Sequence, residues 1–130
     1  MTEIKFEKMC EITRELIKRY AFVSRDHNPI HVDDEVAKKS GLPGVIAHGM
    51  LTAAYMAKRA DDFSLSLDGS WEVSRFQTRF KSMCFPGDIV SVGGKIKSQT
   101  EQECIIQIKA VNQKDAVLCA GVVHFKKLAD

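Results

Sequence analysis

An acidic and a basic side chain, Asp26 and His31, stand five positions apart in the N-terminal half of the chain. Pro29 lies between them and fixes one backbone torsion, which limits how far the two side chains can separate. A carboxylate and an imidazole held together can exchange a proton with one water molecule at neutral pH, since the reference pKa of histidine is about 6.5. The pair therefore indicates general acid–base chemistry.

A second motif, Ile-Ala-His-Gly-Met at residues 46–50, precedes an alanine-rich run. This run predicts a helix that opens at His48 and Gly49. The first amides of a helix lack partners within it, so they donate hydrogen bonds to anions and carry about half a positive charge. We expect the Gly49 amide to stabilise negative charge on a carbonyl oxygen. Beside an acid–base pair, such an amide favours the addition of water to a polarised C=C bond, or its removal.

Hydrophobic spacing places helices in the first half of the chain and strands in the second. A strand or extended arm is expected over residues 4–12, and helices over residues 14–23 (capped by Thr13), 33–39 and 49–62. Strands are expected over residues 71–80, 88–99, 104–112 and 117–127. The first half of the long helix is apolar on every side, which predicts its burial. The order predicts an α+β fold in which an antiparallel sheet curls around a central helix.

Composition limits the classes of function. The 130 residues, 45% hydrophobic and 28% charged, predict one domain over residues 1–130. A net charge of +2 without a basic stripe argues against nucleic-acid binding. No apolar run resembles a signal peptide or a bilayer span, so a cytoplasmic protein without a membrane partner is expected. The four cysteines form no CxxC pair and are expected to be reduced and mostly buried.

The Asp-His-Asn-Pro-Ile-His run at residues 26–31, the Ile-Ala-His-Gly-Met-Leu run at 46–51 and the Phe-Pro-Gly-Asp run at 85–88 resemble the MaoC-like hydratase/dehydratase family. That family includes (R)-specific enoyl-CoA hydratases and (3R)-hydroxyacyl-ACP dehydratase subunits. The resemblance covers most of the chain, from about Thr13 to the last strand. It implies a hot-dog fold that works as a dimer of such domains.

The resemblance also implies roles for single residues. Asp26 and His31 fall on the positions of the catalytic pair, and the Gly49 amide falls where the thioester carbonyl is polarised. Three further residues are assigned to the substrate site: Asn28, His48 and Met50. Asn28 is expected to support the loop, His48 to be chiefly a structural residue at the helix start, and Met50 to belong to the core or the tunnel wall.

Two positions depart from the family pattern. Arg25 stands where the family usually has glycine, and a positive φ at that position would cost a non-glycine residue about 1 kcal/mol. Ala54 stands where some hydratases carry a serine, so no hydroxyl group is assigned there.

The predicted function is reversible addition of water to trans-2-enoyl thioesters, by an (R)-specific enoyl-CoA hydratase or 3-hydroxyacyl-thioester dehydratase of fatty acid metabolism. The expected partners are an acyl-CoA or acyl-ACP substrate and a second copy of the chain, in a homodimer or higher oligomer. No cofactor and no metal are expected. Length of the acyl chain, type of carrier and physiological direction stay open.

Four alternatives compete with this prediction. Asp26 and Asn28 are also typical Asx-turn residues. His27, His31 and either Asp26 or Asp33 offer metal ligands, although no second ligand cluster completes the shell. A non-catalytic subunit of a heterodimeric dehydratase, or a hot-dog acyl-CoA thioesterase, would use the same scaffold.

Overall fold

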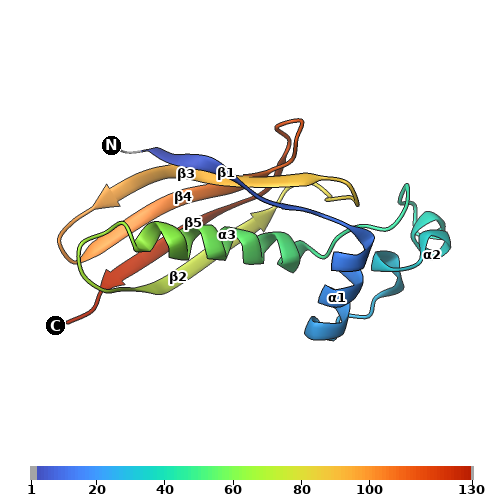
Figure 1. The fold of residues 1–130 in the computed structure, drawn as a ribbon, viewed down its shortest axis with the longest axis horizontal. Coiled ribbons are helices and arrows are strands. Elements are labelled where there is room, and N and C mark those ends of the chain that lie inside the picture. Colours follow the sequence, from blue (N-terminus) through green and yellow to red (C-terminus); the bar gives the residue numbers. More distant parts are fainter. Residues whose placement is uncertain (1–2, 130) are drawn as a thin grey trace.

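The computed structural model describes residues 3–129, in which five antiparallel strands form one sheet packed against a long helix (Figure 1). The strands are β1 (Glu3–Glu11), β2 (Trp71–Phe80), β3 (Ile89–Gln99), β4 (Glu103–Val111) and β5 (Val117–Lys127). Their order across the sheet is β1-β3-β4-β5-β2. The expected hot-dog arrangement is therefore confirmed.

The helices also lie where hydrophobic spacing predicted them. They are α1 (Arg14–Ser24), the short 3-10 helix η1 (Pro29–His31), α2 (Asp34–Lys39) and α3 (Gly49–Ser64). The Thr13 side chain accepts a hydrogen bond from the Leu16 amide at 3.0 Å and caps α1. Ile12 and Ile17 flank this cap and are fully buried, which anchors the start of α1 to the core. None of these helices is long and apolar enough to cross a membrane.

The core forms between the inner face of the sheet and α3. Alternate residues of β4 point inward and are buried, as the sequence pattern predicted: Cys104, Ile106, Ile108 and Ala110. On β5, a Cβ atom at Gly121 would lie 2.8 Å from the Met56 side chain and 2.6 Å from the main-chain oxygen of Gln77. Glycine at this position therefore allows α3 to sit directly on the sheet.

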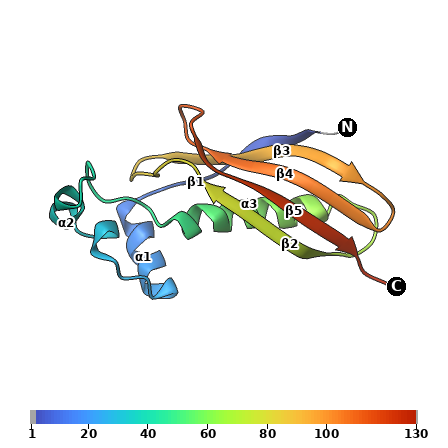
Figure 2. The same cartoon turned by 180° about the vertical axis from the view of Figure 1, so that it is seen from behind.

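The prediction that the first half of α3 is buried on every side is wrong for this chain. Leu51, Met56 and Ala60 are buried against the sheet, but Met50 is 60% exposed and Ala54 is exposed one turn later. The sheet covers only one side of the helix (Figures 1 and 2). Apolar residues all around a helix therefore do not ensure burial when one chain supplies a single covering layer.

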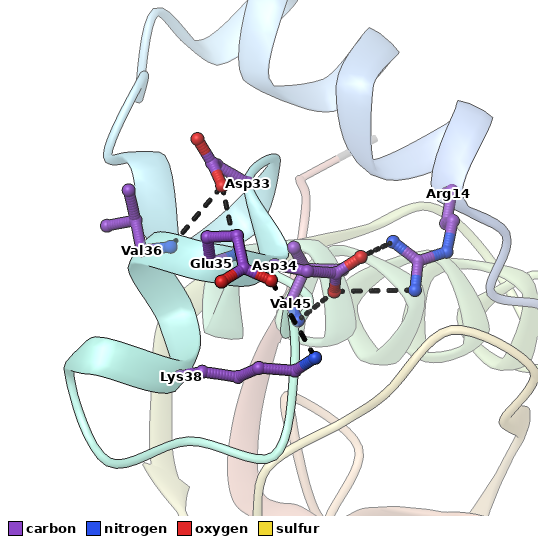
Figure 3. A network of polar contacts seen from close by, with 7 residues as sticks. All are labelled: Arg14, Asp33, Asp34, Glu35, Val36, Lys38 and Val45. Atoms are coloured by element: carbon purple, nitrogen blue, oxygen red, sulfur yellow. Dashed lines mark hydrogen bonds and ion pairs between the residues drawn. The ribbon is translucent and has the colours of Figure 1, made fainter.

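The three short helical segments α1, η1 and α2 gather beyond the N-terminal end of α3 (Figure 1). Asp34 ties this group to the segment that enters α3 (Figure 3). Its carboxylate accepts a hydrogen bond from the Val45 amide at 3.0 Å and pairs with Arg14 at 2.9 Å. The Val45 amide and the Arg14 guanidinium hold the pKa of Asp34 below its usual value. The polar network thus fixes the approach to α3.

Candidate active site

The loop after α1 carries the first of the predicted site residues. Arg25 ends α1 in the left-handed conformation (φ 63°, ψ 20°), as the usual glycine of the family at this position implied. Asp26 follows and is exposed, and its carboxylate accepts a hydrogen bond from the Asn28 amide at 3.3 Å. The Asn28 side chain in turn accepts from the Ile30 amide at 3.3 Å and caps η1. Asn28 therefore shapes the turn into η1.

His31 ends η1 and is only 8% exposed. Its Nδ1 atom donates a hydrogen bond to the main-chain oxygen of Ile46 at 2.7 Å. Because a carbonyl oxygen can only accept, the ring hydrogen of neutral His31 sits on Nδ1 and the lone pair on Nε2. The backbone of the segment before α3 thus holds His31 in the tautomer that a general base needs.

A third side chain joins this pair. Asp26, His31 and His48 each place a polar atom within 4.8 Å of the others. The His31 and His48 rings stack with centroids 3.8 Å apart, and Tyr20 meets His48 edge-on at 4.9 Å. His48 Nε2 donates a hydrogen bond to the main-chain oxygen of Asp26 at 3.1 Å. Burial lowers the pKa of His48, so its ring stays neutral near pH 7.

Asp26, His31 and His48 are also candidate ligands of a metal ion. A metal ion bonds a histidine nitrogen in the plane of the ring, at about 2.0–2.1 Å. The His31 and His48 rings are stacked and only 22° from parallel. No position therefore lies in both ring planes within such a bond length of both nitrogens. Of the other ligands considered from the sequence, His27 is exposed and Asp33 caps α2. This arrangement does not fit a shared metal ion.

Gly49 is the first residue of α3, and among residues 3–129 its N–H has no hydrogen-bond acceptor. A Cβ atom at this position would lie 3.0 Å from the Phe80 ring. Glycine therefore lets the aromatic ring of β2 lie against the start of the helix. The amide predicted to bind a carbonyl oxygen is free to do so.

A cleft of about 710 Å³ opens beside this amide. Gly49, Thr52, Phe80, Phe85 and Leu118 contribute to its largely apolar lining. Ile46 also lines the cleft and is the residue whose carbonyl orients His31. His31 and the cleft therefore adjoin through the segment that leads into α3.

Two further expectations concern residues near this cleft. Met50 does not belong to the core, since its side chain is 60% exposed. It lies on the face of α3 that the sheet leaves uncovered. Cys84 lines the cleft, and burial raises the pKa of its thiol to about 12. Cys84 therefore stays protonated at neutral pH and is a poor nucleophile, as expected from the sequence.

The family described as "MaoC like domain" matches residues 1–117 of the chain. The chain belongs to this family. It is 30% identical over 113 residues to fatty acid synthase 2 of Mycosarcoma maydis (83% of this chain). It is 60% identical over 43 residues to 3-hydroxyacyl-thioester dehydratase X of Mycobacterium tuberculosis (33% of this chain). The chain spans only 3% and 15% of the lengths of these two relatives.

Solved structures share the fold over nearly the whole chain. The (R)-hydratase from A. caviae, described as involved in PHA biosynthesis, superposes with a TM-score of 0.82 at 21% identity and covers 98% of both chains. A structure titled MaoC-like dehydratase superposes with a TM-score of 0.81 at 28% identity, over 98% of this chain and 39% of its own. Both structures therefore contain the same arrangement of helix and sheet.

Proposed function

We propose that this MaoC-like protein interconverts trans-2-enoyl and (3R)-3-hydroxyacyl thioesters by reversible addition of water. The convergence of Asp26 and His31 with His48, the residue that precedes the free Gly49 amide, is the observation that carries the proposal. Similar proteins support it, since they include a 3-hydroxyacyl-thioester dehydratase and the enoyl-CoA hydratase ChsH3, both of Mycobacterium tuberculosis.

In the hydration direction, Asp26 and the Nε2 lone pair of His31 orient one water molecule. As its oxygen bonds to C3 of the substrate, one proton passes to the acid–base pair and the π electrons move toward the thioester oxygen. The Gly49 N–H donates a hydrogen bond to that oxygen, and loss of one such donor in comparable sites costs about 3 kcal/mol. The pair then returns the proton to C2 on the same face. Dehydration follows the same steps in reverse.

The carrier of the acyl group is proposed to be CoA or an acyl carrier protein, with the acyl chain in the cleft of about 710 Å³. We also propose that the chain associates with a second copy. One face of α3 is left uncovered, and β2 ends the sheet with an unpaired edge. The similar structures of the ChsH1-ChsH2 and HadBC complexes of Mycobacterium tuberculosis support assembly and leave a heterodimer as the second form to test.

The test follows the loss of absorbance of the conjugated bond when crotonyl-CoA is mixed with the purified protein. We expect His31→Ala and Asp26→Asn to lower kcat by about a hundredfold or more. His27→Ala is the matched control, because His27 is an exposed neighbour in the same loop. Activity of His31→Ala equal to that of the parent would refute the proposal.

The same assay separates two rival functions. Release of free thiol from crotonyl-CoA, detected with a thiol reagent, would indicate a thioesterase. Binding of acyl-CoA without turnover by the chain alone would indicate a non-catalytic subunit of a heterodimer. Chiral analysis of the 3-hydroxyacyl product then decides the stereochemistry, for which the proposal expects the R form.

A further inference from the structure

One buried side chain, that of His48, contacts all the parts of the proposed site. It is 2% exposed, stacks on the His31 ring and donates its Nε2 hydrogen to the main-chain oxygen of Asp26. It also immediately precedes Gly49, whose amide opens α3. The side chain makes no capping bond to that helix, so helix capping does not explain its contacts.

The hydrogen bond from His48 is the only long-range hydrogen bond of Asp26 among the described residues. Within residues 3–129, the other hydrogen bonds of Asp26 reach only Ser24 and Asn28, two positions away in each direction. Local bonds of this kind define a turn but do not place it relative to the rest of the protein. The bond to His48, 22 residues along the chain, supplies that placement.

We propose that His48 is a positioning residue that, as a neutral imidazole, fixes the Asp26 loop and the His31 ring relative to the Gly49 amide. This inference rests on the proposed hydratase/dehydratase function. His48 acts through Asp26 and His31 and exchanges no proton with the substrate. Its contribution is geometric, and a misplacement of reacting groups by about 1 Å can lower a rate by about a hundredfold.

The surroundings of His48 require the neutral ring. Its Nδ1 atom is buried and has no hydrogen-bond partner among the described residues. A proton on Nδ1 would bury an unpaired N–H group and place a positive charge against His31, which must itself accept a proton. The other groups that face the ring are the Tyr20 ring from α1 and the exposed Asp26 from the loop. The lowered pKa of His48 has burial as its main cause and agrees with this reading.

Two substitutions separate the hydrogen bond from the packing. His48→Phe keeps a stacking ring but removes the donor to Asp26, whereas His48→Gln keeps an N–H group near the position of Nε2. On crotonyl-CoA we expect His48→Phe to lower kcat by about ten- to a hundredfold with KM changed less than about threefold. We expect His48→Gln to recover most of that loss. His124→Gln, in β5 and outside the site, is the control and is expected to match the parent.

The melting temperature of each variant shows whether folding accounts for the loss. A purely structural role predicts that kcat follows stability, so that Phe and Gln variants of equal stability have equal kcat. Equal kcat in these two variants, or a His48→Phe variant as active as the parent, would overturn the positioning role.

A readout independent of turnover separates this inference from the proposed function. In uniformly ¹⁵N-labelled protein, NMR spectra should show His48 as the neutral ring with hydrogen on Nε2 at pH 8 and at pH 7. They should also show that His48→Phe, unlike His48→Gln, increases motion of the Asn28 amide. A parent protein inactive on all enoyl-CoA substrates would defeat the proposed function alone. A charged His48, or an unchanged loop in His48→Phe, would defeat the positioning role.

Discussion

The Phe80 ring lies against Gly49 so closely that a Cβ atom on the glycine would stand 3.0 Å from the Cε1 atom of the ring. Because 3.0 Å is shorter than ordinary van der Waals contact between carbon atoms, Gly49→Ala would displace the ring toward the cleft. Phe80 is 51% exposed, so it can move without disturbing the core. We expect kcat for crotonyl-CoA to fall at least about tenfold while the melting temperature hardly changes.

The double variant Gly49→Ala with Phe80→Leu isolates the cause of that loss. A smaller side chain at position 80 leaves room for the added methyl group, so most of the activity should return. If the double variant stays as inactive as Gly49→Ala, the glycine is needed for a reason other than the Phe80 contact.

The fold was predictable because the strands carry a periodic pattern. Alternation in β4 predicted which residues face α3, and β2 and β5 have the predicted bounds. The exposed side of α3 was not predictable from one sequence, since burial of its apolar residues depends on what packs on the helix. Met50 illustrates this limit: its type suits a core, but its position places it on the uncovered side.

The part of the candidate site that is local in sequence was predictable, and the part that is distant in sequence was not. Asp26 and His31 are close in sequence, and a short loop can only keep them close in space. His48 is far from both along the chain, and no local pattern signals its stacking on His31. The adjacency of His48 to Gly49 was the available hint. The catalytic roles of these residues and the extent of the domain over residues 1–130 stay predictions.

Arg25 is strained by its left-handed backbone, with φ 63°. This conformation costs a non-glycine residue about 1–2 kcal/mol. Glycine avoids that cost, but it loses more conformational freedom on folding, which offsets part of the gain. Arg25→Gly should therefore raise the free energy of unfolding by up to about 1 kcal/mol, measured by urea denaturation. Arg25→Ala removes the same guanidinium but keeps the strain, so it should show no such gain. Equal stabilisation by both variants would assign the effect to the side chain.

The buried His48 makes stability depend on pH. Its pKa is lowered in the folded protein, so the folded state binds fewer protons than the unfolded state, and stability rises with pH. Its contribution is complete above the ordinary value of 6.5 and is lost as the pH falls below it. Urea midpoints of the parent should therefore fall between about pH 7 and pH 5. The His48→Phe variant starts lower but should show a shallower fall. Parallel pH profiles of the two proteins would contradict this prediction.

The four cysteines should differ sharply in reactivity. Burial raises the pKa of Cys84 to about 12 and of Cys119 to about 11, and Cys104 is also buried, whereas Cys10 is partly exposed. Since the thiolate is the reactive form, a thiol reagent at pH 8 should modify only Cys10 rapidly in the native protein and all four in urea. A Cys10→Ser variant should then show no fast reaction. Rapid modification of Cys84 in that variant would contradict this prediction. It would mean that water enters the cleft beside α3 far enough for the Cys84 thiol to lose its proton.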